Sequence, residues 1–416
     1  MIECRIVENQ SFNPSVIQSL MANKTPAIPL YSCALPYIMK KLYCLAICCL
    51  FILPVIAQSK LVPKFLRRTL FEKDSSKRSS IIPLPVLSSA PETGIEVGGS
   101  VLYSFYTDTL HPGTRVSNVF AYGTITTKGQ NRASISTNYW TPNNIYHYTA
   151  SLGFLNFPSD FYGIGSATRS ADAERIGEKR YKFNLAGEKL VSKSIYVGLV
   201  AGAFDYKYSS STPNGIFETD PLVQDRSGGA SVFIGPSFIF DTRNNNTYTT
   251  RGLFLTTNYQ FTKGIFGNNG YSGGLFTIEF SQYFLLSKRL VLAYDLYDNS
   301  LIGSQTPFYL LPEMGSDELM RGYYNGRYRD KNYIAGQTEL RYRLTDRFGL
   351  VGFAGTGTVF HDSFNTDLLK PNYGGGLRYF FDVEKGLSIR LDYGVGEQRP
   401  GESRQSGFYI GLGEAF

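Results

Sequence analysis

Few residues of this chain could do covalent chemistry. His111, His147 and His361 are the only histidines, and His361-Asp362-Ser363 is the one segment in which an imidazole stands beside a serine that it could activate. This segment follows the end of a predicted strand and is made of turn-forming residues, so an ordinary loop is the simpler interpretation. No HExxH motif, Walker loop or dinucleotide fingerprint in a strand-to-helix context is present. We therefore expect no enzyme activity, no metal and no cofactor.

A charged strand in the last quarter of the chain is more informative. Between Tyr333 and Leu344, polar residues alternate with mostly apolar ones; the polar set is Gln337, Glu339, Arg341 and Arg343. Successive side chains of a strand point to opposite faces, so one face is charged and the other apolar. This pattern is typical of a transmembrane β-barrel strand, with its apolar face toward lipid and its polar face toward a wet lumen.

The composition agrees with a barrel. Charged residues make up only 18% of the 416 residues, and 30 Phe and 30 Tyr stand against a single Trp. Aromatic residues in such numbers suit the two interfacial girdles of a membrane barrel, although a large soluble β-protein would also be aromatic-rich. The net charge of +7 is spread along the chain, so no nucleic-acid partner is predicted.

The amino-terminal region predicts export. Residues 39–57 combine a basic start at Met39 with an apolar run and small residues near Ala57, which is the pattern of a cleaved signal peptide. All five cysteines lie at or before Cys49, so the mature chain has no thiol, as suits an oxidising compartment. We interpret residues 1–38 as the product of a start codon assigned too early.

Residues 58–93 are predicted to form a basic periplasmic tail. Their apolar residues fall roughly on one helical face between 63 and 73, so this stretch is either a short amphipathic helix or an unstructured tail. Such a helix could lie on the membrane surface or plug the barrel mouth. Pro83, Pro85 and Pro91 are expected to end regular structure before the barrel begins at Gly94.

Residues 94–416 are predicted to form an all-β, antiparallel transmembrane barrel of sixteen strands. Most of the strands have the ~9 to 11 residues that a tilted strand needs to cross a bilayer. The predicted strands are 94–106, 115–127, 131–140, 145–156, 161–168, 179–190, 194–208, 228–241, 250–262, 270–284, 288–302, 331–343, 347–360, 372–381, 386–396 and 406–416.

The connections separate into long outer loops and short periplasmic turns, as membrane barrels require. The outer set includes 209–227, 303–330, 361–371 and 397–405, and the periplasmic set includes 128–130, 191–193, 285–287 and 382–385. Asp241 and Arg243 are expected to brace a periplasmic turn rather than bind a ligand. The weakest strand is 161–168; without it, residues 80–89 would have to supply the sixteenth strand, and we prefer 161–168.

The last predicted strand resembles the assembly signal of an outer-membrane protein. Its apolar face carries Phe408, Ile410, Leu412 and the terminal Phe416. Glu414 interrupts this face, and we expect it at the periplasmic rim, where a carboxylate costs less than in mid-membrane.

Several segments together resemble the bacterial surface antigen superfamily, the group of BamA/TamA-type outer-membrane assembly and translocation barrels. The matching segments are Leu319-Met320-Arg321-Gly322-Tyr323, Glu339-Leu340-Arg341-Tyr342, the turn at 240–245, the stretch 161–165 and the ending 409–416. The loop with Arg321-Gly322-Tyr323 is the most specific of them.

The resemblance implies that the sixth outer loop folds back into the barrel. Arg321 would dock on acidic residues of the inner wall with Glu339 as one acceptor, Gly322 would let the backbone bend, and Tyr323 would pack on the wall. The family often places a second acceptor on the next strand, but Gly355 occupies that position here. The docking is therefore expected to rest on Glu339 or on another carboxylate.

The resemblance also implies a function at the outer membrane of a Gram-negative bacterium. Family members that insert or secrete proteins usually carry periplasmic POTRA domains, and residues 58–93 are too short for one, so the chain resembles the stand-alone barrels. We expect insertion, assembly or translocation of proteins, with membrane lipid, nascent outer-membrane or secreted proteins and the assembly machinery as partners. A passive channel or structural barrel is the alternative, and an outer-membrane lipid hydrolase is a remote one.

A seam between the first and last strands is a further candidate feature. The predicted first strand contains Gly94, Gly98 and Gly99, and the last contains Gly407, Gly411 and Gly413. Glycine weakens strand pairing, so these two strands could separate toward lipid and pair with an incoming strand.

Overall fold

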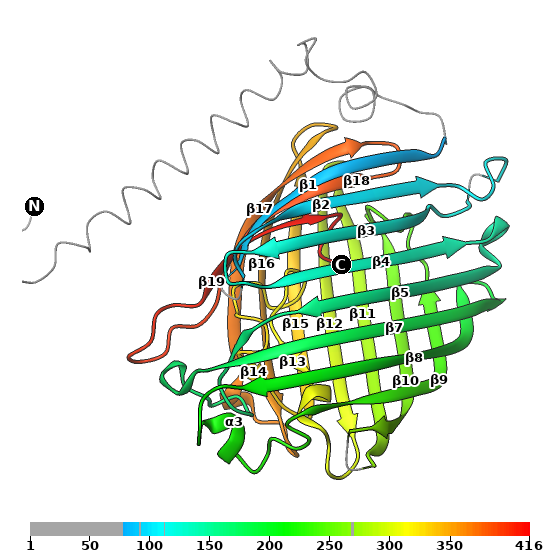
Figure 1. Cartoon of the computed structure of the whole chain (residues 1–416). Helices are drawn as coiled ribbons and strands as arrows, with labels where there is room; N and C mark the ends of the chain where they lie inside the picture. Colours follow the sequence, from blue (N-terminus) through cyan, green and yellow to red (C-terminus); the bar gives the residue numbers. More distant parts are fainter. Residues whose placement is uncertain (1–77, 91–92, 112, 268–269) are drawn as a thin grey trace, which may run out of the picture. The chain divides into compact units, whose positions relative to one another are not determined.

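The described part of the chain forms one antiparallel sheet that curls into a barrel (Figure 1). The computed structural model describes residues 78–90, 93–111, 113–267 and 270–416. The predicted start at Met39, the signal peptide 39–57 and the helix at 63–73 lie outside these residues. No helix in the described segments is long and apolar enough to cross a membrane.

Sixteen strands make the wall, which confirms the predicted fold class. They are β1 (Ser80–Ala90), β2 (Gly94–Phe105), β3 (Ser117–Thr126), β4 (Asn131–Trp140), β5 (Tyr146–Asn156), β7 (Glu174–Ser192), β8 (Ile195–Ser210), β9 (Gly228–Asp241), β10 (Gly252–Phe266), β11 (Ser272–Ser287), β12 (Leu290–Ile302), β15 (Asn332–Arg343), β16 (Phe348–Phe360), β17 (Lys370–Asp382), β18 (Leu387–Val395) and β19 (Ser406–Leu412).

Short elements complete the described fold. They are β6 (Ser159–Phe161), β13 (Glu313–Met314), β14 (Tyr328–Arg329), the α-helix α3 (Ile216–Thr219) and the 3-10 helices η2 (Pro142–Asn144), η3 (Ser170–Asp172), η4 (Phe308–Leu310) and η5 (Thr366–Leu368). Each wall strand pairs with its neighbours along the chain, β5 pairs directly with β7, and β1 meets β19 at the seam of the barrel.

The set of sixteen strands differs from the predicted one in two places. The predicted strand 161–168 is wrong: β6 covers only three residues and pairs with the end of β7, and the chain then leaves the wall. The predicted tail 58–93 is wrong over its last part, because β1 pairs with β2 along its whole length. Pro83 and Pro85 lie inside β1, where they do not end the strand.

Because β1 replaces the predicted strand 161–168 in the wall, the first connections lie at the opposite ends of the barrel from those predicted. We call the end that carries residues 303–331 the loop end, and the end that carries residues 344–347 the turn end. Gln130 donates to the carbonyl of Pro158 at 2.9 Å, so the turn 127–130 lies at the loop end. The predicted periplasmic place of 128–130 is therefore wrong. The predicted separation into long and short connections also fails at the turn end, where the long connection 242–251 joins β9 to β10.

Inward and outward side chains alternate as the predicted barrel requires. In β7, Tyr181, Phe183 and Leu185 point outward and are exposed, whereas Glu174 and Glu188 point inward and are buried. An apolar outer face and a polar inner face suit a wall between lipid and a lumen.

The connection 242–251 lies across the mouth at the turn end. Asn246 donates to the carbonyl of Val116 at 3.2 Å, and Thr247 donates to the carbonyl of Lys385, next to β18. Tyr248 packs edge-on against Phe380 of β17, with 5.0 Å between ring centroids. Three distant parts of the wall are thus joined at this end.

The place of β1 in the wall can be tested with a disulfide. Leu87 and Val97 are Cα partners across β1 and β2. Cysteines at these positions should form a disulfide on mild oxidation, because paired residues in an antiparallel ladder lie ~4.5 to 5.5 Å apart. The pair Leu87→Cys and Val101→Cys, which is out of register, is the control and should stay reduced. Equal oxidation of both pairs in non-reducing electrophoresis would contradict the register.

Candidate functional site

The long connection 303–331 folds into the barrel and is held there by buried side chains. Met320, Arg321, Tyr323 and Tyr328 are at most 1% exposed. β13 and β14 pair within the connection, and the N–H of Gly165, in the connection 157–173, donates to the carbonyl of Arg329 at 2.8 Å. Two loop-end connections therefore pack against each other, and the stretch predicted as a strand at 161–168 serves this contact instead.

Arg321 lies at the centre of the site and touches two carboxylates. Its Nη2 is 2.5 Å from Oε1 of Glu339 on β15, and its Nη1 is 2.6 Å from Oδ2 of Asp392 on β18. The guanidinium also stacks over the ring of Phe353 at 3.6 Å. Arg321, Glu339 and Asp392 are fully buried. A buried charge of this kind is stable only when it is paired and hydrogen-bonded.

The two carboxylates are shared with arginines of the wall. Glu339 also accepts from Arg341 Nε at 2.8 Å, and Asp392 accepts from Arg378 Nη1 at 2.5 Å. Arg378 reaches further, to Glu414 at 2.7 Å. Three arginines and three carboxylates therefore alternate through the site, and the inward positions of β15, β17 and β18 supply most of them.

The neighbours of Arg321 fix the backbone of the connection. Gly322 has φ +110°, and a Cβ there would lie 2.8 Å from the backbone nitrogen of Val395, so only glycine fits. Its N–H donates to the hydroxyl of Tyr409 at 2.9 Å.

Tyr323 continues this contact with the wall. Its hydroxyl donates to the carbonyl of Pro371 at 2.7 Å and accepts from the N–H of Glu397 at 2.9 Å. Burial raises the pKa of the Tyr323 phenol, which keeps the hydroxyl protonated and able to donate.

The second acceptor, Asp392, was not predicted. A Cβ at Gly355 would lie 2.6 Å from the carbonyl oxygen of Gly336 and 2.7 Å from Oδ1 of Asn372, so that position has no room for a carboxylate. The available signal was the alternation in β18, which puts Arg390 and Asp392 on the inward face. Alternation gives the face of a strand but not the partner across the lumen.

The end of the chain divides between wall and lumen. Phe408 is 41% exposed, and Phe408, Ile410 and Leu412 occupy the outward positions of β19. Gly413 has φ +75°, and the tail then turns inward. The predicted place of Phe416 on the same face is wrong: its ring lies 4.8 Å from the guanidinium of Arg341, and its carbonyl accepts from Arg341 at 2.8 Å.

Glu414 is likewise absent from the exposed rim where it was expected. Its side chain is 3% exposed and bonds Arg378. A buried carboxylate is more stable beside lumen arginines than in the apolar wall, which explains why the tail leaves β19.

Asp241 and Arg243 lie at the turn end of β9, away from Arg321. Asp241 Oδ1 accepts from the backbone N–H of Arg243 at 3.0 Å, and its Oδ2 accepts from Arg243 Nη2 at 2.8 Å. Arg115 also donates to Oδ2, from the connection before β3. The carboxylate therefore joins two turn-end connections.

The histidines make structural contacts. Nδ1 of His361 faces Asp330 at 2.9 Å, and His147 stacks on Trp140 with 3.9 Å between rings. His111 contacts Asp108 in the connection after β2. Within residues 78–90, 93–111, 113–267 and 270–416, no group of three or more His, Cys, Asp or Glu side chains could hold a metal ion.

Removal of the Arg321 side chain should destabilise the infolded connection. Arg321→Ala leaves Glu339 and Asp392 buried with one arginine each, so we expect the free energy of unfolding to fall by about 3 kcal/mol or more. Arg404→Ala, in the exposed connection 396–405, is the control and should change it by no more than about 0.5 kcal/mol. Urea titration followed by tryptophan fluorescence measures both. Similar values for the two variants would contradict a docking role of Arg321.

Comparisons with known proteins identify the family of this chain. The family model for the Omp85 superfamily domain matches residues 121–416. A search among curated protein sequences returned no match. Similar solved structures include BamA from Haemophilus ducreyi lacking POTRA domains 1–3, at a TM-score of 0.52 and 12% identity; the match covers 81% of this chain and 70% of that one.

Two further structures are CdiB proteins. CdiB from Acinetobacter baumannii and CdiB from Escherichia coli each match at a TM-score of 0.50 and 12% identity over 80% of this chain. The matches cover 60% and 62% of the CdiB chains. At this identity the likeness concerns the fold, whereas the family model covers more than half of the sequence. The chain belongs to the Omp85 superfamily.

Proposed function

We propose that this barrel acts in the insertion, assembly or translocation of proteins at the outer membrane of a Gram-negative bacterium. Nascent outer-membrane or secreted proteins, the assembly machinery and membrane lipid would be its partners. The connections 303–331 and 396–405 would then face the exterior, and the turn end the periplasm. The proposal involves no enzymatic chemistry, cofactor or metal.

The observation that carries this proposal is the seam of the barrel. β1 and β2 share eleven Cα pairs and β18 and β19 share seven, whereas β1 and β19, over their described residues, share the single pair Ser89–Phe408. A wall with one weakly paired seam can part there at low cost, and the opening would face the lipid. A protein segment could pass from lumen to membrane at such a place.

The infolded connection supports the same function. Its docking through Arg321, Gly322 and Tyr323 fills the lumen with ordered, buried side chains. A lumen occupied in this way suits the handling of protein segments at the wall better than a steady flow of solutes. Phe408, Ile410, Leu412 and Phe416 would serve as the chain's own assembly signal.

Depletion of the protein tests the proposal. We expect selective loss of other barrels or of surface proteins from the outer membrane, measured by quantitative proteomics. Wild-type protein should restore the profile, and a variant with cysteines at positions 89 and 408 should restore it only under reducing conditions. An unchanged profile after depletion would favour the alternative, a passive channel or structural barrel. Full rescue by the oxidised variant would show that the seam need not open.

A further inference from the structure

The two prolines of β1 reveal which way its backbone groups point. In an antiparallel ladder, residues alternate between pairs that exchange two backbone hydrogen bonds and pairs that exchange none. Pro83 faces Val101 and Pro85 faces Gly99 within an unbroken ladder between β1 and β2. Since proline has no N–H, both pairs must be of the second kind. The odd positions of β1 therefore point their backbone groups away from β2, toward the seam.

This edge of β1 lacks donors where a partner strand would need them. Ile81 and Leu87 carry an N–H toward the seam, but Pro83 and Pro85 between them present only carbonyl oxygens. A strand that paired here would leave two of its own carbonyls without a donor. Within a membrane such unsatisfied groups are strongly unfavourable.

The edge of β19 has no such gap. The N–H of Gly413 donates to the carbonyl of Ser388 at 2.8 Å, and the carbonyl of Gln405 accepts from Gly396 at 2.9 Å. The odd positions of this segment therefore bond toward β18. The even positions, which include Ile410 and Leu412, point both an N–H and a carbonyl toward the seam.

The register shows that the prolines stand where β19 leaves the wall. Extending the observed pair Ser89–Phe408 puts Leu87 opposite Ile410, Pro85 opposite Leu412 and Pro83 opposite Glu414. β19 ends at Leu412, and Glu414 bonds Arg378 inside the barrel. β19 thus ends opposite Pro85, the first proline that the extended register reaches.

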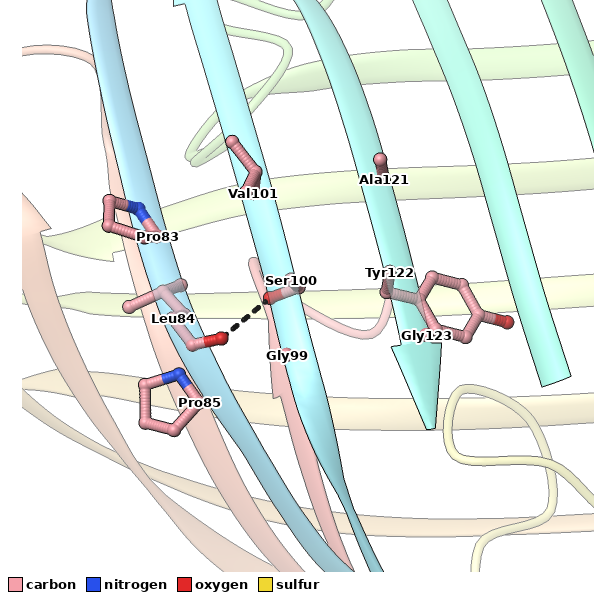
Figure 2. A pocket seen from close by; sticks show the side chains of 9 residues that line it. All are labelled: Pro83, Leu84, Pro85, Gly99, Ser100, Val101, Ala121, Tyr122 and Gly123. Carbon is pink, nitrogen blue, oxygen red and sulfur yellow. Dashed lines mark hydrogen bonds between the residues drawn. The ribbon is translucent and has the colours of Figure 1, made fainter. Parts of the chain in front are cut away.

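The wall beside the prolines carries small side chains. Figure 2 shows Pro83 and Pro85 on β1 next to Gly99 and Val101 on β2, with Ala121 on β3. These residues line an open hollow of about 650 Å³. A Cβ built on Gly99 would meet no atom within 4 Å.

We propose that Pro83 and Pro85 prevent β1 and β19 from pairing along the turn-end half of the seam, and that an extended peptide strand entering there pairs with β19 rather than with β1. An edge that cannot donate is a known means of avoiding strand addition. The origin of the peptide strand in a client protein rests on the proposed function, but the block to self-pairing does not.

Cysteine pairs test the block. In the extended register Ile82 faces Ala415, at the close spacing of a pair that exchanges no hydrogen bonds, ~4.5 Å, which permits a disulfide. Ile82→Cys with Ala415→Cys should remain reduced in the natural background and become oxidised when Pro83→Val and Pro85→Val are added. Cysteines at 89 and 408 are the matched control, should be oxidised in both backgrounds, and report that the barrel is folded. Oxidation of the 82–415 pair in both backgrounds, or in neither, would overturn the proposal.

A peptide tests whether the edge of β19 accepts an added strand, without changing the prolines of the barrel. The probe is a synthetic copy of residues 80–90 with valine in place of both prolines and cysteine in place of Leu87; the same peptide with its prolines kept is the control. Offered to the full chain with Ile410→Cys, the valine peptide should cross-link about tenfold more than the control, because it regains two backbone hydrogen bonds. Equal cross-linking would overturn the assignment of strand addition to β19.

These measurements are made on purified protein, so they do not depend on client insertion in cells. A negative proteome result together with a positive peptide result would reject the proposed function and leave the seam assignment intact. The reverse combination would retain the function and place strand addition elsewhere.

Discussion

A fully buried guanidinium must be neutralised by its surroundings, and the site around Arg321 is organised by this requirement. The side chain arrives on a connection, not on a wall strand, so the wall has to hold the opposite charges in place before it docks. Glu339 and Asp392 do so from β15 and β18, which are separated in the sheet by β16 and β17. The connection is therefore positioned by electrostatics across several strands, and not by its own secondary structure.

The same requirement links the end of the chain to the infolded connection. Asp392 forms ion pairs with Arg321 and Arg378, and Arg378 also forms an ion pair with Glu414. Movement of the tail back into the wall would separate Glu414 from Arg378. Arg378 would then depend more on Asp392 to neutralise its charge. Wall, tail and connection thus form one network of charges, in which a change at one member alters the pairing of the others.

The fold class could be predicted from the sequence because side-chain alternation is a local property. The number of strands was predicted correctly, but one strand was misplaced, because Pro83 and Pro85 look like strand breakers in isolation. Two prolines spaced by one residue are compatible with an edge strand whose alternate N–H groups are not needed, and only the register reveals this. Glu339 could be placed on the charged face of its strand, and the family resemblance then proposed it as an acceptor for Arg321. Asp392 depends on which strands face each other across the lumen, and no local pattern carries that information.

The contacts at the turn end affect the flow of ions through the barrel. The connection 242–251 joins the segment before β3 to the turn before β18, while the infolded connection occupies the space below the loop end. For an ion crossing the barrel, these two obstructions act as resistors in series. The larger one sets the total resistance, so release of the smaller one alone would leave the current nearly unchanged. A large flow of ions through the lumen would require both connections to move at the same time.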